Sequence, residues 1–164
     1  MTKKSHVALS HAFWNSPSPQ EQYIALVQAG GRSDPSTIEA LFQALPQVKP
    51  SQSLGDWNHG GFFDTGHPIN EQLMEIKWIG KSFKSVEDVD PVIIDQDGKP
   101  ASWGKWGLAS LREMVYEGTV SMAMIYDDRP IIDHFRYVDD DFMAGIMEGK
   151  ALGEAGKFYF YLRR

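Results

Sequence analysis

The chain has 164 residues, 42% of them hydrophobic and 23% charged, which is the balance of a soluble protein with one substantial core. Sixteen lysines and arginines against twenty-two aspartates and glutamates give a formal net charge of -6, so no nucleic-acid partner is expected. The absence of cysteine excludes disulfides, zinc–thiolate sites and cysteine nucleophiles. Since neither a signal-peptide core nor a membrane-spanning apolar stretch is present, the expected location is cytoplasmic.

Residues 1–50 are predicted to form a helical segment that packs on the rest of the chain. Ser18, Pro19 and Glu21 have the spacing of an N-cap, a first-turn proline and a capping-box partner, and the helix should stop at Gly30-Gly31. A second helix should begin at Asp34-Pro35. Its apolar stripe recurs at helical spacing, at Ile38, Leu41, Phe42 and Leu45.

Residues 55–68 mix four glycines with one tryptophan, two aspartates and two histidines. Glycine allows sharp bends and close backbone approach, while the other side chains supply a rigid ring and hydrogen-bonding groups. This segment is the part of the sequence least explained by generic folding.

Residues 51–164 are predicted to form one antiparallel β-barrel, with a motif region at 51–107 and a meander at 108–164. Apolar runs of strand length at 108–116, 120–126, 131–138, 142–147 and 158–162 are separated by short turns. Asp97-Gly98 is typical of a type I′ hairpin turn. Seven or eight strands are expected, while residues 69–76 are ambiguous.

Two strands show faces of mixed polarity. In 120–126 the bulky face carries Val120, Met122, Met124 and Tyr126. In 131–138 one face carries Ile131, Asp133, Phe135 and Tyr137, and the other Ile132, His134, Arg136 and Val138. Such strands either line a cavity with a few polar groups or belong to an ordinary sheet with amphipathic residues at its edge.

Gly55-x-Trp57 ahead of a meander that ends in Arg163 and Arg164 resembles the signature of the calycin barrels, which include lipocalins and fatty-acid-binding proteins. In that family an arginine from a late strand covers the tryptophan at the closed end of the barrel, a cation–π contact. The resemblance implies that Gly55, Trp57, Arg163 and Arg164 close the barrel.

Further motifs resemble the bacterial GXWXG family and the domain of unknown function, DUF4334, that usually follows its motif. They are Phe63-Asp64-Thr65-Gly66-His67-Pro68, Trp78-x-Gly80-Lys81-x-Phe83, Asp88-Val89-Asp90-Pro91, Tyr126-Asp127-Asp128-x-Pro130-Ile131-x-Asp133-x-Phe135-Arg136 and the closing Phe158-Tyr159-Phe160-Tyr161-Leu162-x-Arg164. Asn58-His59 displace the second glycine of the naming motif to Gly60. The resemblance implies a calycin-like barrel and assigns no activity.

His67 is the candidate functional histidine, because Asp64 and Thr65 in the same glycine-rich loop could orient its imidazole. The alternative is that these polar side chains only bond to neighbouring backbone groups. Arg136, if it points inward, could anchor a ligand carboxylate. The alternative for Arg136 is a salt bridge with Asp127 or Asp128.

The predicted function is binding of an apolar or amphiphilic small molecule, such as a fatty acid, terpenoid or aromatic acid, inside the barrel. The expected ligand-binding residues are Asp64, His67, Trp78, Phe83, Met124, Tyr126, Phe135 and Arg136. One alternative is an enzyme with decarboxylase-like or isomerase-like acid–base chemistry carried by His67, Tyr126 and Arg136. The other is a structural or interaction protein with a filled barrel.

No metal site is expected, since the five histidines are scattered and no His-x-x-x-His pair occurs. No cofactor is expected either, although haem, which some small calycin barrels bind through one histidine, is left open. A homodimer is also left open by the sequence.

Overall fold

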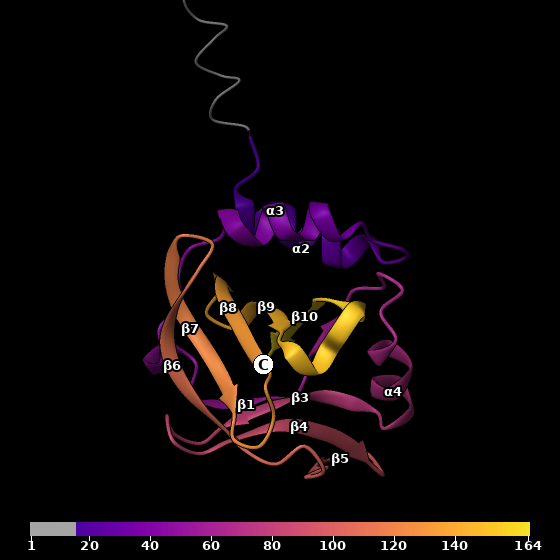
Figure 1. Cartoon of the computed structure of the whole chain (residues 1–164). Helices are drawn as coiled ribbons and strands as arrows, with labels where there is room; N and C mark the ends of the chain where they lie inside the picture. The colour runs from indigo at the N-terminus through magenta and orange to yellow at the C-terminus, as the bar shows by residue number, and fades with distance from the viewer. Residues whose placement is uncertain (1–15) are drawn as a thin grey trace, which may run out of the picture.

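The computed structural model describes residues 16–164, which form a curled antiparallel sheet with two helices on its outside and a third packed against its inner apolar cluster (Figure 1). The helices are α2 (Pro19–Ala29), α3 (Pro35–Ala44) and α4 (Ile69–Glu75), with 3-10 turns η1 (Pro50–Gln52) and η2 (Lys150–Ala155). The strands are β1 (Gly55–Trp57), β2 (Gly61–Phe62), β3 (Trp78–Phe83), β4 (Val89–Gln96), β5 (Lys99–Ser102), β6 (Ala109–Tyr116), β7 (Thr119–Tyr126), β8 (Ile132–Asp139), β9 (Phe142–Glu148) and β10 (Phe158–Arg163).

The strands follow the path β1-β3-β4-β6-β7-β8-β9-β10-β2, and β5 pairs with β4. Every pairing is antiparallel, and β6 to β10 form the expected meander. The predicted mainly β fold, a small antiparallel barrel with N-terminal helices, is therefore confirmed as a curled sheet. Nine strands lie on the path instead of seven or eight, because residues 55–62 bend and form two short strands.

That bend joins the two ends of the sheet. β1 pairs with β3, while β2, only a few residues later, pairs with β10. In the bend, the His59 N–H donates to Arg163 O (3.1 Å) and the Gly60 N–H donates to Ile79 O (2.7 Å). A Cβ atom on Gly60 would lie 3.0 Å from both Ile79 O and Tyr161 O, so glycine lets the segment fit between the two strands.

The helix and hairpin signals produce the predicted elements. The Ser18 hydroxyl accepts the Glu21 N–H at the start of α2, and α3 begins directly after Asp34. Asp97 and Gly98 both have positive φ in the β4–β5 hairpin, as a type I′ turn requires. The ambiguous residues 69–76 are helical, as α4.

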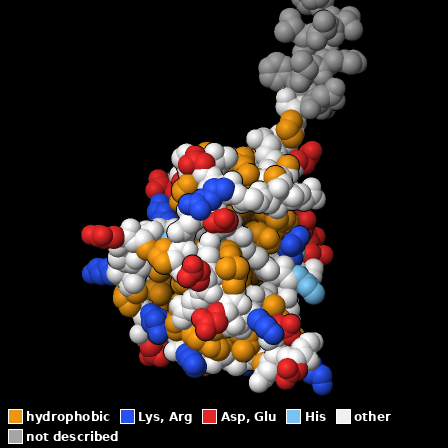
Figure 2. All heavy atoms as spheres, turned by 90° about the vertical axis from the view of Figure 1, so that its right-hand side faces the viewer, with side chains coloured by type: hydrophobic (Ala, Val, Ile, Leu, Met, Phe, Trp, Pro, Cys, Tyr) orange, Lys and Arg blue, Asp and Glu red, His pale blue; other side chains and the backbone are white. Residues whose placement is uncertain are grey.

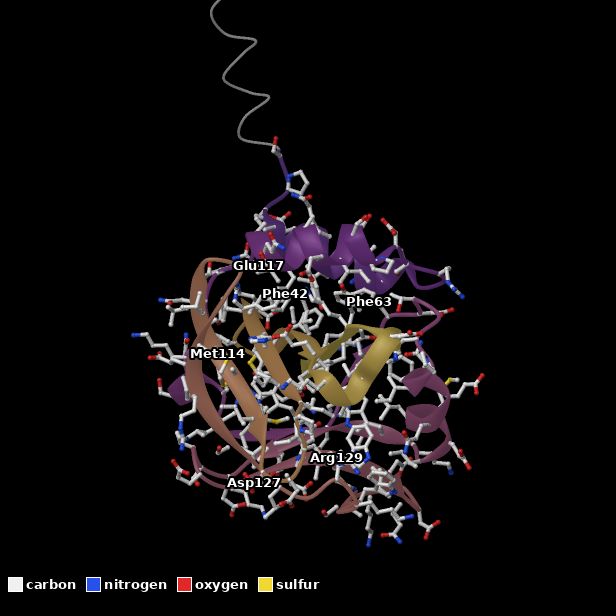
Figure 3. All side chains as sticks on the ribbon, viewed as in Figure 1. Phe42, Phe63, Met114, Glu117, Asp127 and Arg129 are labelled. Atoms are coloured by element: carbon white, nitrogen blue, oxygen red, sulfur yellow. The ribbon has the colours of Figure 1, made fainter. Side chains whose placement is uncertain are left out.

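Two apolar clusters lie on opposite sides of the sheet. The inner cluster fills the curl and includes all four methionines of β7 and β9, namely Met122, Met124, Met143 and Met147. The outer cluster joins α2 and α3 to the convex face through Tyr23, Ile38, Phe42, Phe63 and Phe142. Figure 1 shows α2 and α3 lying together across one side of the sheet, and Figure 3 shows Phe42 and Phe63 between these helices and the strands.

Candidate functional site

A small cavity lies inside the curl, between the sheet and α4. Its volume is about 20 Å³, and its walls are mainly apolar, formed by Leu73, Trp78, Val92, Trp106, Phe158 and Phe160. A cavity of this size holds about one water molecule. Three polar side chains, those of Lys81, Tyr126 and Asp133, share this wall.

Lys81 and Asp133 form a buried ion pair at the cavity. Lys81 Nζ lies 3.1 Å from Asp133 Oδ2, and the two side chains are 5% and 0% exposed. The ammonium also donates to Pro91 O at 3.0 Å. Aromatic rings surround it, with Nζ 5.7 Å from the Trp78 ring centroid, 5.9 Å from Tyr126 and 5.1 Å from Phe160. These rings enclose the ammonium at cation–π distances.

Irregular pairing between β3 and β4 places Lys81 inside. Trp78 and Lys81 are three residues apart, so a regular strand would point them to opposite faces. β3 advances two residues between Trp78 and Gly80 while β4 advances one, which marks an extra residue on β3. Both side chains therefore reach the cavity. A compensating extra residue on β4 lies beside Pro91, whose missing N–H is tolerated at such a bulge.

The Asp133 carboxylate has no hydrogen bond beyond its ion pair. Both of its oxygens are shielded from solvent; Oδ2 faces only the Lys81 ammonium, and Oδ1 has no hydrogen-bond donor among the described residues. Burial raises the pKa of Asp133, while Lys81 lowers it in part. The cavity therefore contains an acceptor that lacks a donor, which is a costly arrangement in a purely structural core.

Tyr126 and Trp106 mark the rim of the cavity. Burial, and then the charge of Asp133, raise the pKa of Tyr126 well above its usual value, so its phenol stays protonated. The Trp106 ring packs edge-on against Tyr126 and beneath the Arg129 guanidinium, which lies 4.9 Å from the ring centroid. Trp106 is only half-buried, and Gly104 and Gly107 beside it have positive φ. Arg129 belongs to the β7–β8 connection, as Figure 3 shows.

Five of the expected ligand-binding residues belong to the inner cluster: Trp78, Phe83, Met124, Tyr126 and Phe135. Only Trp78 and Tyr126 line the cavity. The other three are packed into the core beneath it; Phe83 and Phe135, for example, meet edge to face at 5.9 Å.

His67 and Asp64 lie outside the cavity. His67 Nε2 donates to Gly156 O at 3.0 Å, and Nδ1 accepts the Ile69 N–H at 3.1 Å, so both ring nitrogens are engaged with backbone. Asp64 accepts the Gly66 N–H and forms an exposed ion pair with Arg32. This arrangement corresponds to the loop-capping alternative, in which the polar side chains of the loop bond to backbone groups.

The inward placement expected for Arg136 is wrong. Asp133 points into the curl, and three positions later Arg136 points out of it, beneath α3. There the buried guanidinium lies 5.0 Å from the Phe42 ring centroid and donates to Tyr116 O. Burial lowers the pKa of Arg136. His67, Tyr126 and Arg136 thus belong to three different parts of the structure, and the catalytic set built from them is not assembled.

The barrel-closing contact is made by the last residue described. The Arg164 guanidinium lies 4.3 Å from the Trp57 ring centroid and donates to Leu54 O and Asp140 O. Trp57 Nε1 donates to Ser53 O at 2.7 Å. Gly55 approaches the same guanidinium. Arg163 instead covers Phe142 and Tyr161 on the convex face.

Neither Lys81 nor Asp133 is among the ligand-binding or catalytic residues expected from the sequence. A signal for Asp133 is present in the sequence, because it is an acidic residue on the same strand face as Ile131, Phe135 and Tyr137. Lys81 had no comparable signal, because its inward direction depends on the bulge in β3.

Metal and membrane features are limited in the described part of the chain. Within residues 16–164, no group of three His, Asp or Glu side chains is placed to hold a metal ion. His6 and His11 lie outside those residues. No helix in the same range has the length and apolarity needed to span a membrane.

Fold and site together define a class: a curled antiparallel barrel with a small apolar cavity that contains a buried ion pair. Residues 40–98 match the family model described as GXWXG protein, and residues 107–164 match the one described as a domain of unknown function, DUF4334. The chain belongs to the family that joins these two parts. A crystal structure of a protein from Thermomonospora curvata is similar, with 40% identity and a TM-score of 0.81, over 89% of this chain and 97% of that one. No curated protein matches the sequence.

Proposed function

We propose that the protein binds a small, uncharged, largely apolar molecule that carries one hydroxyl or carbonyl group. The observation that carries this proposal is the Lys81–Asp133 pair, in which the carboxylate oxygen Oδ1 lacks a donor at a mainly apolar cavity. A ligand hydroxyl would donate to Asp133, and a ligand carbonyl would accept from Lys81 or Tyr126.

The charges at the cavity favour an uncharged ligand over an acid. Lys81 is already neutralised by Asp133 at 3.1 Å. A ligand carboxylate would add a second negative charge beside Asp133 in a poorly solvated site. A terpenoid alcohol or ketone therefore fits better than a fatty or aromatic acid, and Arg136 cannot supply the missing positive charge from the convex face.

A ligand larger than water requires the cavity to open. The half-buried Trp106, in a loop with left-handed glycines at positions 104 and 107, is the side chain best placed to swing outward. The cost includes its contacts with Tyr126 and Arg129. A filled barrel is the competing interpretation, and the unmatched carboxylate argues against it.

The test compares cyclohexanol, cyclohexanone and cyclohexanecarboxylate, which share one apolar ring. Binding to the full chain is measured by chemical-shift perturbation at neutral pH. We expect the neutral compounds to bind and to shift the indole signals of Trp78 and Trp106, while the acid binds at least tenfold more weakly.

Asp133→Asn should reduce the discrimination against the acid. Asp90→Asn is the matched control, because Asp90 is also buried but lies on the outer groove beside Asp56 and Ser82. Tighter binding of the acid would overturn the uncharged-ligand class. If none of the three compounds perturbs the cavity residues, the binding function itself is wrong.

A further inference from the structure

Three groups with complementary roles converge on the cavity. Lys81 Nζ is 3.1 Å from Asp133 and 5.9 Å from the Tyr126 ring centroid. Asp133 Oδ1 is an acceptor without a donor among the described residues. Tyr126, which is only 4% exposed, lines the same cavity and carries a phenol that can donate a hydrogen bond.

The lysine has hydrogen-bonding capacity left over. Two of its three N–H groups are used, by Asp133 and by Pro91 O. The third is free to donate to a ligand at the cavity. Aromatic rings on β3, β7 and β10 surround Nζ, a setting that suits a cationic hydrogen-bond donor through cation–π contacts.

We infer that this site catalyses proton transfer at the carbon next to the carbonyl group of a bound ketone, with Asp133 as the base and with Tyr126 and Lys81 holding the carbonyl oxygen. The inference rests on the proposed function and names its reaction and substrate class. Burial, which raises the pKa of Asp133, makes its carboxylate a stronger base than a solvated one.

The step is balanced within the site. The C–H bond breaks, its proton passes to a carboxylate oxygen of Asp133, and its electron pair forms the enolate. The Tyr126 hydroxyl and the Lys81 ammonium stabilise the negative charge on the enolate oxygen. Return of the proton to the same carbon restores the ketone. In a β,γ-unsaturated ketone, return of the proton to the γ-carbon gives the conjugated α,β-unsaturated isomer. No oxidant or reductant is needed.

The experiment follows deuterium incorporation next to the carbonyl of cyclohexanone in D2O by NMR, with the full chain at neutral pD. Binding is measured on the same samples by chemical-shift perturbation. We expect the protein to accelerate exchange over buffer. Asp133→Asn should lose roughly 100-fold or more of that acceleration, the usual contribution of a general base.

A second variant distinguishes a loss of catalysis from a loss of the folded structure. Tyr126→Phe keeps the aromatic wall and removes one donor, so it should lose at least tenfold of the acceleration while cyclohexanone still binds. Asp90→Asn, on the outer groove, should exchange like the unaltered chain. A second assay uses cyclohex-3-en-1-one, whose conversion to the conjugated enone is seen by ultraviolet absorbance.

The outcomes separate the two proposals. Binding of cyclohexanone without accelerated exchange would overturn the catalytic inference and leave the binding function standing. Binding of cyclohexanol but not of cyclohexanone would also overturn the catalytic inference, because the proposed reaction requires the site to bind a ketone. Acceleration that survives in Asp133→Asn would show that another group is the base, and would overturn the role of Asp133.

Discussion

At the residue scale, the central feature of the molecule is one buried ion pair. Lys81 and Asp133 are both nearly inaccessible, and their attraction must offset the loss of hydration of two charges. A pair of this kind contributes little net stability, yet removal of one partner is costly because the other charge is then buried alone. Stability measurements can therefore reveal the pair independently of any ligand.

Lys81→Met should destabilise the protein by about 3–5 kcal/mol near neutral pH, because the Asp133 carboxylate loses its counter-charge. Urea unfolding measures this loss. Lys99→Met is the control, since Lys99 is exposed on β5 and should change the free energy of unfolding by less than about 0.5 kcal/mol. Equal effects of the two variants would contradict the burial of the pair.

The loss in Lys81→Met should also depend on pH. The pKa of Asp133 is raised by burial, and without Lys81 it rises further. The folded state then keeps a proton that the unfolded chain releases above about pH 4, so the free energy of unfolding falls as pH rises. The deficit should therefore be smallest near pH 4 and grow towards neutrality. A deficit independent of pH would point to lost packing instead of an unpaired charge.

At the element scale, the bent segment β1–β2 and the bulged pair β3–β4 shape the site. The bend connects β3 to β10, and the bulges turn Lys81 inward towards Pro91 O. Both depend on close backbone approach, which is most severe at Gly80. A Cβ atom there would lie 1.6 Å from Trp57 O.

Gly80→Ala should cost at least about 3 kcal/mol of unfolding free energy, because β1 must move away from β3. Chemical denaturation measures it. Gly118→Ala is the matched control in the β6–β7 turn, where φ is +77° and the space is open. That change should cost only about 1–2 kcal/mol from the left-handed conformation. A smaller loss at Gly80 than at Gly118 would contradict the described β1–β3 contact.

The contact between β1 and the chain end is testable in the same way. Arg164→Ala removes the cation over Trp57 and the hydrogen bonds to Leu54 O and Asp140 O, and should cost about 1–2 kcal/mol. Thermal and urea unfolding measure it. Arg163→Ala, on the convex face, should cost less. The reverse order would mean that Arg163 is the closing residue.

At the scale of the whole molecule, the helices α2 and α3 are attached to the convex face through the outer cluster. Tyr23 is central to this layer: its ring meets Phe63 and Phe142 edge to face, and its hydroxyl donates to Phe160 O. Figure 2 shows that lysine, arginine and acidic side chains are interspersed on the face it presents, with no extended basic patch there. The attachment of the helices combines the apolar contacts of the outer cluster with polar contacts, such as the Tyr23 hydrogen bond and the Lys157–Glu39 ion pair.

Tyr23 gives this attachment a sensitivity to alkali. Burial, followed by the charge of Tyr161, raises the pKa of Tyr23 well above 10.0. The contribution of Tyr23 to the free energy of unfolding is fully present below the pKa of tyrosine in the unfolded chain, near 10. It is lost as the pH rises above that value towards the raised pKa of the folded state, by up to about 1.4 kcal/mol per pH unit. Unfolding followed by circular dichroism above pH 10 should show a shallower decline in Tyr23→Phe than in the unaltered chain. Identical slopes would mean that the phenol ionises equally in both states.

The sequence by itself determined the elements and much of the core. Capping residues fixed the start of α2, Asp97-Gly98 fixed a hairpin, and period-two alternation grouped Met122, Met124 and Tyr126 on one face of their strand, which the structure places inside. These are local properties, set by backbone preferences and side-chain periodicity within a few residues.

Only the tertiary structure decided the polar site. Strand periodicity alone could not settle which face of β8 points inward, and so could not choose between Asp133 and Arg136. The direction of Lys81 depends on a bulge, which is a property of two paired strands and not of one. His67 looked functional until the fold supplied Gly156 O as its partner. The pairing of residues 81 and 133 is a long-range contact, made by the closure of the sheet, and no local pattern in the sequence encodes it.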